Sequence, residues 1–492
     1  MKRRKVEVEK TLKSNEYDDA EENWGLVKKA VLSSQNNWRK MLLSYLRSQE
    51  DETSAREKVL KEVNFQFLTQ ILASYNATTS EEDRQIFDAL ELLENTYKIN
   101  VNMISPIVWG EQSVEIYKKR GQLGGTLSRT TPEQVLELLD GMRMWNTVLN
   151  HSRPVMTDSN GDTHDGKVLY DVRFLLRLFL SMMHPGSELK YRSFVERNGL
   201  ALAFSCTSST DITVRRLAYC VLQKFLTLLH ELDIDTADDR YKNLYVYLLR
   251  ILKQSIETEA PRLPHMVSHF FARVSKLILH PESPVYTAVL SFFILKPVIE
   301  LNNVPEFYKL LLSSSADHHN QEREWILTLI LDALIEPKDY NVLQNRSGIK
   351  VMLCLFTTCM VDMVARRLIL SILKAAVQMP SVAHDLFYRM NLQSWIASVI
   401  KSRDLSVWEQ CFLGQIYSIL IESERKTCRS AEPDPSKKSY LVAQASARIT
   451  SKVVLYVMEA ISHKQIAEEN VQSIKTTLDS KWRPKRKKQE SS

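Results

Sequence analysis

The segment Asp211-Ile-Thr-Val-Arg-Arg-Leu-Ala218 shows most clearly how this chain folds. It opens on an aspartate, a residue that caps the free N–H groups at a helix start, and it runs on into an apolar stripe that reaches Phe225. The same order returns at Asp362-Met-Val-Ala-Arg-Arg-Leu-Ile369, whose apolar stripe reaches Leu373. The repeated pattern predicts two helices that begin after an aspartate, carry an arginine pair in the first turns and bury one face.

Glycine is scarce, which favours helices throughout. Only 12 of the 492 residues are glycine, and none lies between Gly199 and Gly348. An ordinary soluble protein contains ~7% glycine. An α/β nucleotide-binding domain needs glycine in its phosphate loops and turns, whereas long helices do not. Because period-two alternation is also sparse, we expect an all-α protein.

The spacing of the helices indicates how they are arranged. Between Val168 and Ser423, apolar stripes of about 10 to 20 residues follow one another with short polar joints, many of them marked by proline. The two quoted segments resemble the second half of HEAT-type repeats. We therefore predict an irregular α-solenoid of HEAT/armadillo-like helical repeats. Because no exact repeat period is visible, a non-repetitive helical bundle is the alternative.

Polar and glycine-bearing breaks suggest the domain boundaries. One break, Ser105–Thr131, interrupts the N-terminal helices, and a second precedes the long helical series. The predicted regions are a charged N-terminal segment at 1–20, an N-terminal helical region at 21–150, a polar linker at 151–167, a helical-repeat domain at 168–424, a loop at 425–438, terminal helices at 439–480 and a basic tail at 481–492.

The net charge of +6 is concentrated at the two ends of the chain. Lys2–Lys5 contribute four cations, and the twelve residues Lys481–Ser492 contribute six. The body between them is close to neutral, so it does not resemble a broad cationic surface for nucleic acid. The N-terminus lacks an apolar secretory segment, and no apolar run approaches the ~18 residues of a membrane helix. We therefore expect no membrane partner.

Six cysteines are spread through the chain without a CxxC pair. Most of them lie in apolar helical stretches, so we expect buried, reduced thiols in an intracellular protein. The six are Cys206, Cys220, Cys354, Cys359, Cys411 and Cys428.

Motifs that carry chemistry are missing. The sequence has no phosphate-binding GxxxxGK[ST] or GxGxxG, no GxSxG and no HExxH. The stretch Asp158–Gly166 resembles a calcium loop, but Thr163 stands where that loop needs glycine and Leu169 where it needs glutamate. A solvated loop is the better interpretation. We predict no cofactor, no small-molecule substrate and no enzymatic activity, with an enzyme whose residues meet only in the folded chain as the alternative.

Two histidine pairs are candidate ligands. His265 and His269 would share one face of a helix, but no third ligand is suggested nearby, so we interpret them as partly buried core residues. His318 and His319 lie in a polar joint and are expected at the surface. We therefore predict no metal site.

The basic tail is the clearest functional segment. A cationic run of this density cannot pack into a core without partners, and it is typical of nuclear targeting or of contact with RNA phosphates. A merely solvating tail is the alternative. The candidate residues are Lys481, Trp482, Arg483, Lys485, Arg486, Lys487 and Lys488.

Several longer phrases are similar to the C-terminal region of one family, the nucleolar pre-ribosomal-associated protein one family of Urb/Npa-type large-subunit ribosome assembly factors. The similarity runs from about Val101 to Ser423. The phrases are Thr131-Pro-Glu-Gln-Val-Leu-Glu-Leu-Leu-Asp140, Arg143-Met-Trp-Asn-Thr-Val-Leu149, Leu169-Tyr-Asp-Val-Arg-Phe-Leu-Leu-Arg-Leu-Phe179, Phe194-Val-Glu-Arg-Asn-Gly-Leu-Ala-Leu-Ala203, Ala218-Tyr-Cys-Val-Leu222, Val304-Pro-Glu-Phe-Tyr-Lys-Leu-Leu-Leu-Ser-Ser-Ser315 and Glu322-Arg-Glu-Trp-Ile-Leu327.

The resemblance implies a function as well as a fold. Family members are long helical-repeat scaffolds without a known catalytic centre, and they act in early assembly of the large ribosomal subunit in the nucleolus. The resemblance thus implies a nuclear and nucleolar protein that binds other assembly factors and supports rRNA maturation, and it leaves open whether pre-rRNA is bound directly. Such proteins are several times longer than this chain. A helical adaptor or RNA-binding module of the nucleus, unrelated to ribosome assembly, is the alternative.

Overall fold

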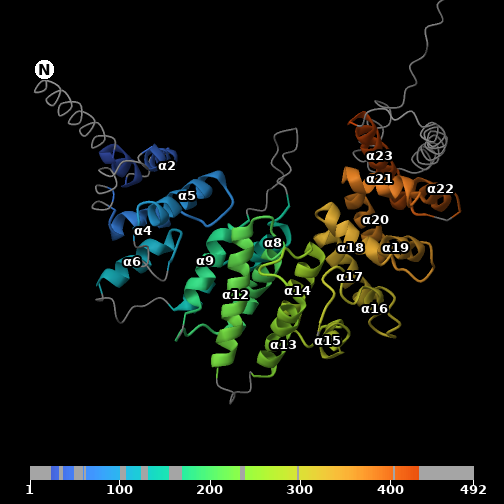
Figure 1. The fold of residues 1–492 in the computed structure, drawn as a ribbon, viewed down its shortest axis with the longest axis horizontal. Helices are drawn as coiled ribbons and strands as arrows, with labels where there is room; N and C mark the ends of the chain where they lie inside the picture. Colours follow the sequence, from blue (N-terminus) through green and yellow to red (C-terminus); the bar gives the residue numbers. More distant parts are fainter. Residues whose placement is uncertain are drawn as a thin grey trace, which may run out of the picture. The chain divides into compact units, whose positions relative to one another are not determined.

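The computed structural model describes residues 24–32, 37–48, 59, 63–99, 107–122, 131–153, 169–184, 186–232, 239–295, 298–402 and 405–430. Within these ranges the regular elements are helices, and the β structure is confined to an isolated bridge between Thr78 and Tyr170 (Figure 1). The prediction of an all-α protein is confirmed.

The chain forms two compact units, and each is described by itself. Unit 1 comprises Met1–Leu263 and Phe271–Pro281, and unit 2 comprises Pro264–Phe270 and Glu282–Ser492. Helix α14 (His265–Leu277) contributes residues to both. The other helices of unit 1 are α2 (Trp38–Ser48), α4 (Phe65–Ala73), α5 (Glu81–Asn95), α6 (Gln112–Gln122), α7 (Pro132–Glu137), α8 (Gly141–Asn150), α9 (Val172–Met182), α10 (Tyr191–Glu196), α11 (Gly199–Cys206), α12 (Ile212–Glu231) and α13 (Asp239–Ser255).

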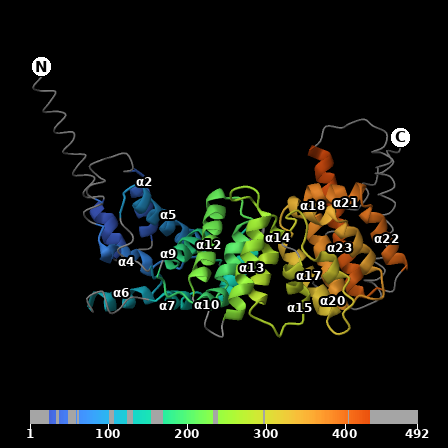
Figure 2. The same cartoon turned by 60° about the horizontal axis from the view of Figure 1, so that its bottom comes forward.

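Unit 2 continues the helical series. Its helices are α15 (Tyr286–Leu295), α16 (Phe307–Leu311), α17 (His319–Ala333), α18 (Pro337–Asn345), α19 (Gly348–Phe356), α20 (Met363–Val377), α21 (Pro380–Tyr388), α22 (Leu392–Ser402) and α23 (Val407–Ser430). In this unit α17 packs against α20 and α20 against α23, so these three helices form a row (Figure 2).

A block of three helices recurs in both units. Each block has a first helix, a residue with positive φ, a second helix and a longer third helix. The positive-φ residue is Asn198 (φ 63°) before α11, Ser347 (φ 54°) before α19 and Asn391 (φ 50°) before α22. The third helices of the two successive blocks of unit 2, α20 and α23, pack together, and in unit 1 the third helix α12 packs against the preceding helix α9. This stacking confirms the predicted irregular, armadillo-like α-solenoid.

The repeat is hard to see in the sequence because its helices differ in length. The third helices α12, α20 and α23 span 20, 15 and 24 residues. What recurs is a local backbone conformation, the positive-φ residue before the second helix. Gly199 and Gly348 each follow the positive-φ residue, and a Cβ at Gly199 would lie 2.3 Å from Cε2 of Phe194. The close approach of the first and second helices therefore requires glycine at position 199.

The two quoted aspartate segments form the predicted helices. The side chain of Asp211 accepts a hydrogen bond from the N–H of Thr213 (2.8 Å) at the start of α12. Asp362 accepts one from the N–H of Ala365 (3.3 Å) at the start of α20. The predicted apolar stripes are buried, including Phe225 in unit 1 and Leu373 in unit 2.

Two predicted breaks contain helix. The segment Ser105–Thr131 includes α6, whose buried Tyr117 anchors it: the Tyr117 hydroxyl accepts from the N–H of Val108 (2.9 Å). One buried aromatic residue thus fixes a helix whose apolar pattern is weak. The predicted loop 425–438 begins inside α23, which ends at Ser430, because no proline or glycine occurs in this stretch before Pro433.

The compact units divide at a different place from the polar segment 151–167. Helices α8 and α9 flank that segment, and they pack against α11 and α12 of the same unit. Residues 154–168, the N-terminal segment 1–20, the terminal helices expected at 439–480 and the tail lie outside the described residues.

Candidate interaction surfaces

The sequence-predicted sites fall partly outside the structure. All seven tail candidates, Lys481 to Lys488, lie outside the described residues, as does the calcium-like stretch Asp158–Gly166. The remaining candidates, the two histidine pairs and most cysteines, can be placed.

His265 is a buried structural residue. Its N–H donates to Oδ1 of Asp339 (2.9 Å), and its Nδ1 lies 3.0 Å from Oδ2 of the same carboxylate. Asp339 also accepts from the N–H of Glu336 (2.9 Å), so one carboxylate joins the start of α14 to the start of α18. His269 is buried as well. The interpretation as core histidines is confirmed, with deeper burial than predicted.

Sequence reasoning missed Asp339 because it lies 74 residues from His265. The two residues meet through tertiary packing, and no spacing rule connects them. Within the described part of the chain, no group of three or more histidine, cysteine or acidic side chains could hold a metal ion.

The second histidine pair lies at a helix start. His318 is exposed, as predicted, whereas His319 is half-buried and begins α17. The Nδ1 atom of His319 lies 3.0 Å from the carbonyl oxygen of Ser315. The prediction of two surface residues in a loop is thus wrong for His319, because α17 already begins at that residue.

The prediction of buried cysteines holds for one residue and fails for three. Cys206 is buried, and burial raises the pKa of its thiol. Cys220, Cys354 and Cys359 are exposed, and Cys411 is half-buried. An apolar helical stretch still has an outward face. On α12 the 3.6-residue period turns Ala218 and Val221 inward and leaves Cys220 outside.

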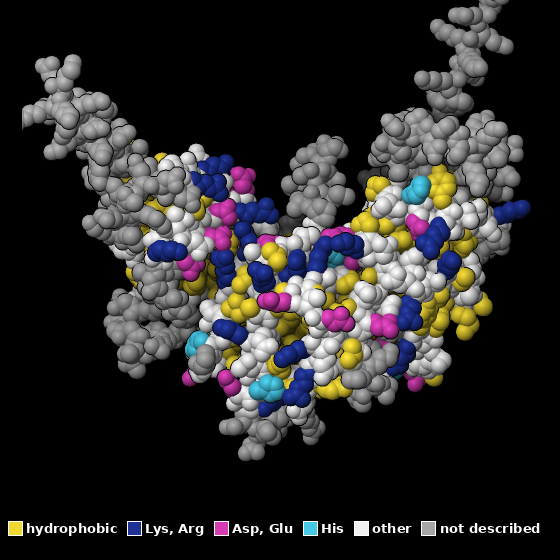
Figure 3. Space-filling view, in the orientation of Figure 1, with side chains coloured by type: hydrophobic (Ala, Val, Ile, Leu, Met, Phe, Trp, Pro, Cys, Tyr) yellow, Lys and Arg dark blue, Asp and Glu magenta, His cyan; other side chains and the backbone are white. Residues whose placement is uncertain are grey.

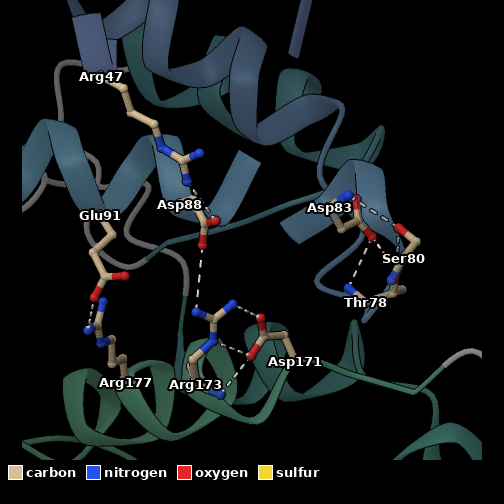
Figure 4. Close-up of polar contacts among 9 residues, drawn as sticks. All are labelled: Arg47, Thr78, Ser80, Asp83, Asp88, Glu91, Asp171, Arg173 and Arg177. Atoms are coloured by element: carbon tan, nitrogen blue, oxygen red, sulfur yellow. Dashed lines mark hydrogen bonds and ion pairs between the residues drawn. The ribbon is translucent and has the colours of Figure 1, made fainter. Parts of the chain in front are cut away.

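A network of arginines and carboxylates joins three helices of unit 1 (Figure 4). Arg47 of α2 and Arg173 of α9 lie on opposite sides of Asp88 of α5, with N–O distances of 3.5 and 3.6 Å. Arg173 also pairs with Asp171 (2.9 Å). Burial alone would lower the pKa of the Arg173 guanidinium, but its hydrogen bond to Asp171 and the surrounding carboxylates raise it above the ordinary value. Because the positive and negative charges are matched, we interpret the network as one that stabilises the packing of these three helices.

The buried carboxylate of Asp83, near this network, belongs to the cap at the start of α5 (Figure 4). Asp83 accepts from the N–H of Thr78 (3.0 Å) and from the Thr78 hydroxyl, and Ser80 accepts from the N–H of Asp83 (3.2 Å). Each of these bonds satisfies a hydrogen-bond donor at the start of α5 or in the turn before it. The cluster therefore caps a helix and offers no carboxylate for acid–base chemistry.

Unit 2 exposes large apolar side chains near the starts of α20 and α23. Arg323 joins the end of α16 to the loop before α20, because its Nε donates to the carbonyl of Leu311 (3.1 Å) and its Nη1 donates to the carbonyl of Met360 (3.2 Å). Figure 3 shows hydrophobic side chains at the surface over α16 and α19. Exposed methionines are typical of adaptable protein-binding surfaces. The exposed apolar side chains of this region, called here the exposed apolar surface of unit 2, are Leu312, Met360, Met363, Val364 and Trp408.

A hollow of about 400 Å³ lies beside α16 and α18 in unit 2. It is lined in part by Val304 to Lys309, which begin one of the phrases that carry the family resemblance. Its charged rim is paired, with Arg346 2.9 Å from Glu300 and Lys309 3.5 Å from Glu306. The lining residues include no histidine or cysteine.

Residues 200–395 match the family described as nucleolar pre-ribosomal-associated protein 1. Over those residues, the chain is similar to this family. The resemblance drawn from the sequence phrases is confirmed.

The curated proteins that resemble this chain are distant and much longer. The mouse protein named nucleolar pre-ribosomal-associated protein 1 is 28% identical over 365 residues, covering 71% of this chain and 16% of the mouse protein. The human protein of the same name is 26% identical over 394 residues, covering 75% of this chain and 17% of the human protein. The chain thus spans about a sixth of the length of the curated relatives it matches.

One solved structure, an engineered protein, aligns over 89% of this chain and 98% of its own, with 12% identity and a TM-score of 0.25. Within the described residues, none of the helices combines the length and the apolar character that crossing a membrane requires.

Proposed function

We propose that this protein is a non-catalytic nucleolar scaffold in the assembly of the large ribosomal subunit. The observation that carries the proposal is the family match over residues 200–395, together with relatives whose names describe nucleolar, pre-ribosome-associated proteins. Stacked helices support it, because a solenoid offers a long surface that can hold several partners at once.

Other assembly factors are the proposed protein partners. The exposed apolar surface of unit 2, which includes Met360 at 74% exposure, supports protein contact. The paired charges in the Asp88 network and in the hollow beside α16 also fit a binding role, since neither presents an uncompensated acid, base or nucleophile.

The basic tail is proposed to direct the chain to the nucleus or to contact precursor rRNA. Lys481, Arg483, Lys485 and Arg486, with Lys487 and Lys488, would supply salt-dependent affinity for phosphates, and Trp482 would stack on a base. Replacing the six cations by glutamine in the full chain separates the two roles. A targeting role predicts cytoplasmic protein with RNA affinity unchanged, and a contact role predicts nuclear protein with weaker RNA binding.

Depletion of the protein tests the proposal as a whole. We expect precursors of large-subunit rRNA to accumulate, precursors of small-subunit rRNA to mature normally, and the wild-type chain to restore processing. Normal large-subunit precursors after depletion would contradict the proposal and favour a nuclear adaptor unrelated to ribosome assembly.

A further inference from the structure

Helices α20 and α23 pack against each other in unit 2, and each leaves a row of side chains accessible to solvent. On α20, Val364, Arg367 and Lys374 follow one another at spacings of three and seven residues, so they lie on one face of the helix. On α23, Trp408 and Phe412 are four residues apart, and their ring centroids are separated by 5.1 Å. These five residues, all exposed or half-buried, are called here the α20–α23 face.

The cations of one row lie over the rings of the other. Cζ of Arg367 lies 5.7 Å from the centroid of the Trp408 ring, and Nζ of Lys374 lies 5.0 Å from that of the Phe412 ring. Lys374 also donates to Oε1 of Gln415 (3.2 Å). A ring attracts a cation but leaves its charge in place. Within the described part of the chain, the two cations contact rings and an amide, and no carboxylate neutralises them.

The acidic residues that begin these two helices already have partners. Asp362 caps the start of α20. Glu409, in the first turn of α23, pairs with Arg366 of α20 at 2.6 Å. Both carboxylates are thus engaged at helix starts, and a carboxylate brought by a partner would complement Arg367 and Lys374.

Exposed apolar side chains continue the face at the start of α20. Met360 and Met363 are 74% and 58% exposed, and Val364 is 46% exposed. Exposed methionines adapt to the shape of a partner, and grouped apolar side chains mark a protein contact. A phosphate backbone gains nothing from them, and the ring faces that Arg367 and Lys374 cover are closed to a stacking base. The face therefore favours a protein over RNA.

We propose that the α20–α23 face binds an amphipathic helix of another protein, with acidic residues along the edge of its apolar side. That apolar side would pack on Met363, Val364 and Trp408, and the carboxylates would meet Arg367 and Lys374. This inference deepens the proposed function and rests on it, because it names the kind of assembly factor that the scaffold would hold.

The spacing of the two cations favours a helical partner. Arg367 and Lys374 are seven residues apart on α20, which is about 10.5 Å along the helix axis. A partner helix presents two acids seven residues apart on one side at this distance. An extended strand covers about the same distance in three residues, and residues three apart in a strand point to opposite faces. The partner should therefore carry acids at positions i and i+7.

The test measures binding of labelled synthetic amphipathic helices to the full chain by fluorescence anisotropy. One peptide carries two glutamates seven residues apart beside a leucine face, and its match carries lysines at those two positions. We expect the glutamate peptide to bind several-fold more tightly, with the difference shrinking as salt rises. The charge reversal Arg367→Glu/Lys374→Glu should weaken the glutamate peptide by roughly tenfold and strengthen the lysine peptide.

Matched control variants exist for both kinds of contact. Lys350→Glu/Lys401→Glu, at exposed positions of α19 and α22, makes the same change in net charge and should leave both affinities unchanged. Met363→Gln should weaken both peptides several-fold, whereas Met142→Gln, at a methionine of α8 that is 72% exposed, should not. Thermal melting of each variant shows whether a change acts through folding.

Four results would overturn the inference. The first is absent or equal binding of the two peptides to the wild-type chain, and the second is a preference that charge reversal does not swap. The third is loss of single-stranded RNA binding, in place of peptide binding, in the charge-reversed chain. The fourth is a carbodiimide cross-link from Lys374 to an acidic residue of 431–492 or of a second copy, because this protein itself would then cover the face.

The outcomes also separate this face from the proposed function. If the face fails while depletion still blocks large-subunit processing, the scaffold proposal stands on other surfaces. If the face binds the glutamate peptide and depletion leaves processing normal, the scaffold proposal fails and the face belongs to an adaptor with another role.

Discussion

Helices α12 and α20 begin with the same pattern, an aspartate followed four and five residues later by two arginines, but they use the first arginine differently. On α12, Arg215 is partly exposed and donates to the carbonyls of Ser209 (2.8 Å) and Thr210 (2.9 Å), just before its own helix. On α20, Arg366 is 11% exposed and pairs with Glu409 of α23 (2.6 Å), which is 1% exposed.

The difference shows what a repeated motif determines. The aspartate acts within one turn, so it caps both helices. The arginine has a longer side chain and contacts the group within its reach, which is the preceding turn of its own block in unit 1 and the start of α23 in unit 2. The motif therefore determines where the helix starts. The neighbouring helices determine whether the first arginine contacts the turn before its own helix or forms a buried ion pair with another helix.

The largest predicted effect comes from the buried arginine. Arg366→Gln leaves Glu409 buried without its partner and should destabilise unit 2 by about 3–5 kcal/mol. Arg215→Gln, which removes partly exposed bonds to carbonyls, should cost about 1 kcal/mol. Urea denaturation with hydrogen exchange of α20 and α23 measures both.

A neutral replacement checks the physical cause of that effect. Arg366→Met with Glu409→Gln keeps the side-chain bond to Ser406 at the start of α23 and leaves no buried charge, so it should recover most of the lost stability. Equal costs for Arg366→Gln and Arg215→Gln would show that burial does not distinguish the two arginines.

The glycines that begin the second helices come next. Gly199→Ala places a Cβ 2.3 Å from the Phe194 ring and should destabilise unit 1 by about 1–3 kcal/mol through overpacking. At Gly348 the nearest atom, the carbonyl oxygen of Leu343, would be 3.0 Å away, so the cost should be smaller. Gly141→Ala meets nothing within 4 Å and serves as the control, with no loss expected in thermal melting.

The two capping aspartates should differ less in their contributions to stability. Asp211 accepts from both the N–H (2.8 Å) and the hydroxyl (2.7 Å) of Thr213, whereas Asp362 accepts from Ala365 alone, at 3.3 Å. Asp211→Ala should cost about 1 kcal/mol and Asp362→Ala about half as much. Equal or reversed costs would show that cap geometry does not set the difference.

The contribution of Asp211 should depend on pH. Hydrogen bonds from Thr213 lower the pKa of its carboxyl below the ordinary 3.8, against the opposing effect of burial. A group whose pKa is lower in the folded state stabilises fully above its unfolded pKa and loses that contribution as the pH falls through the folded value. The stability gap between wild type and Asp211→Ala should therefore stay constant near neutrality and narrow below pH 3.8.

The smallest effect is expected in the exposed network of unit 1. Asp88 and Arg173 are each about a third exposed, so Asp88→Asn should cost about 0.5 kcal/mol, and salt should reduce that cost. The cost of Arg366→Gln should hardly change with salt. Denaturation at two salt concentrations compares them, and a salt-independent cost at Asp88 would contradict the assignment.

Much of the fold could be predicted because its signals are local. Asp211, Asp362 and their apolar stripes are read directly from residue order, and the glycine shortage correctly excludes an α/β domain. The partners of His265 and Arg366 could not be predicted, since Asp339 and Glu409 lie in other helices. Helix α6 was missed because one buried tyrosine, Tyr117, anchors it.

Sedimentation of the tagged full chain from nuclear extract, with identification of the RNA and proteins in each fraction, tests the scaffold proposal most directly. We expect the chain to sediment with early precursors of the large ribosomal subunit and with other assembly factors. Its presence in light fractions, away from large-subunit precursor RNA, would contradict it.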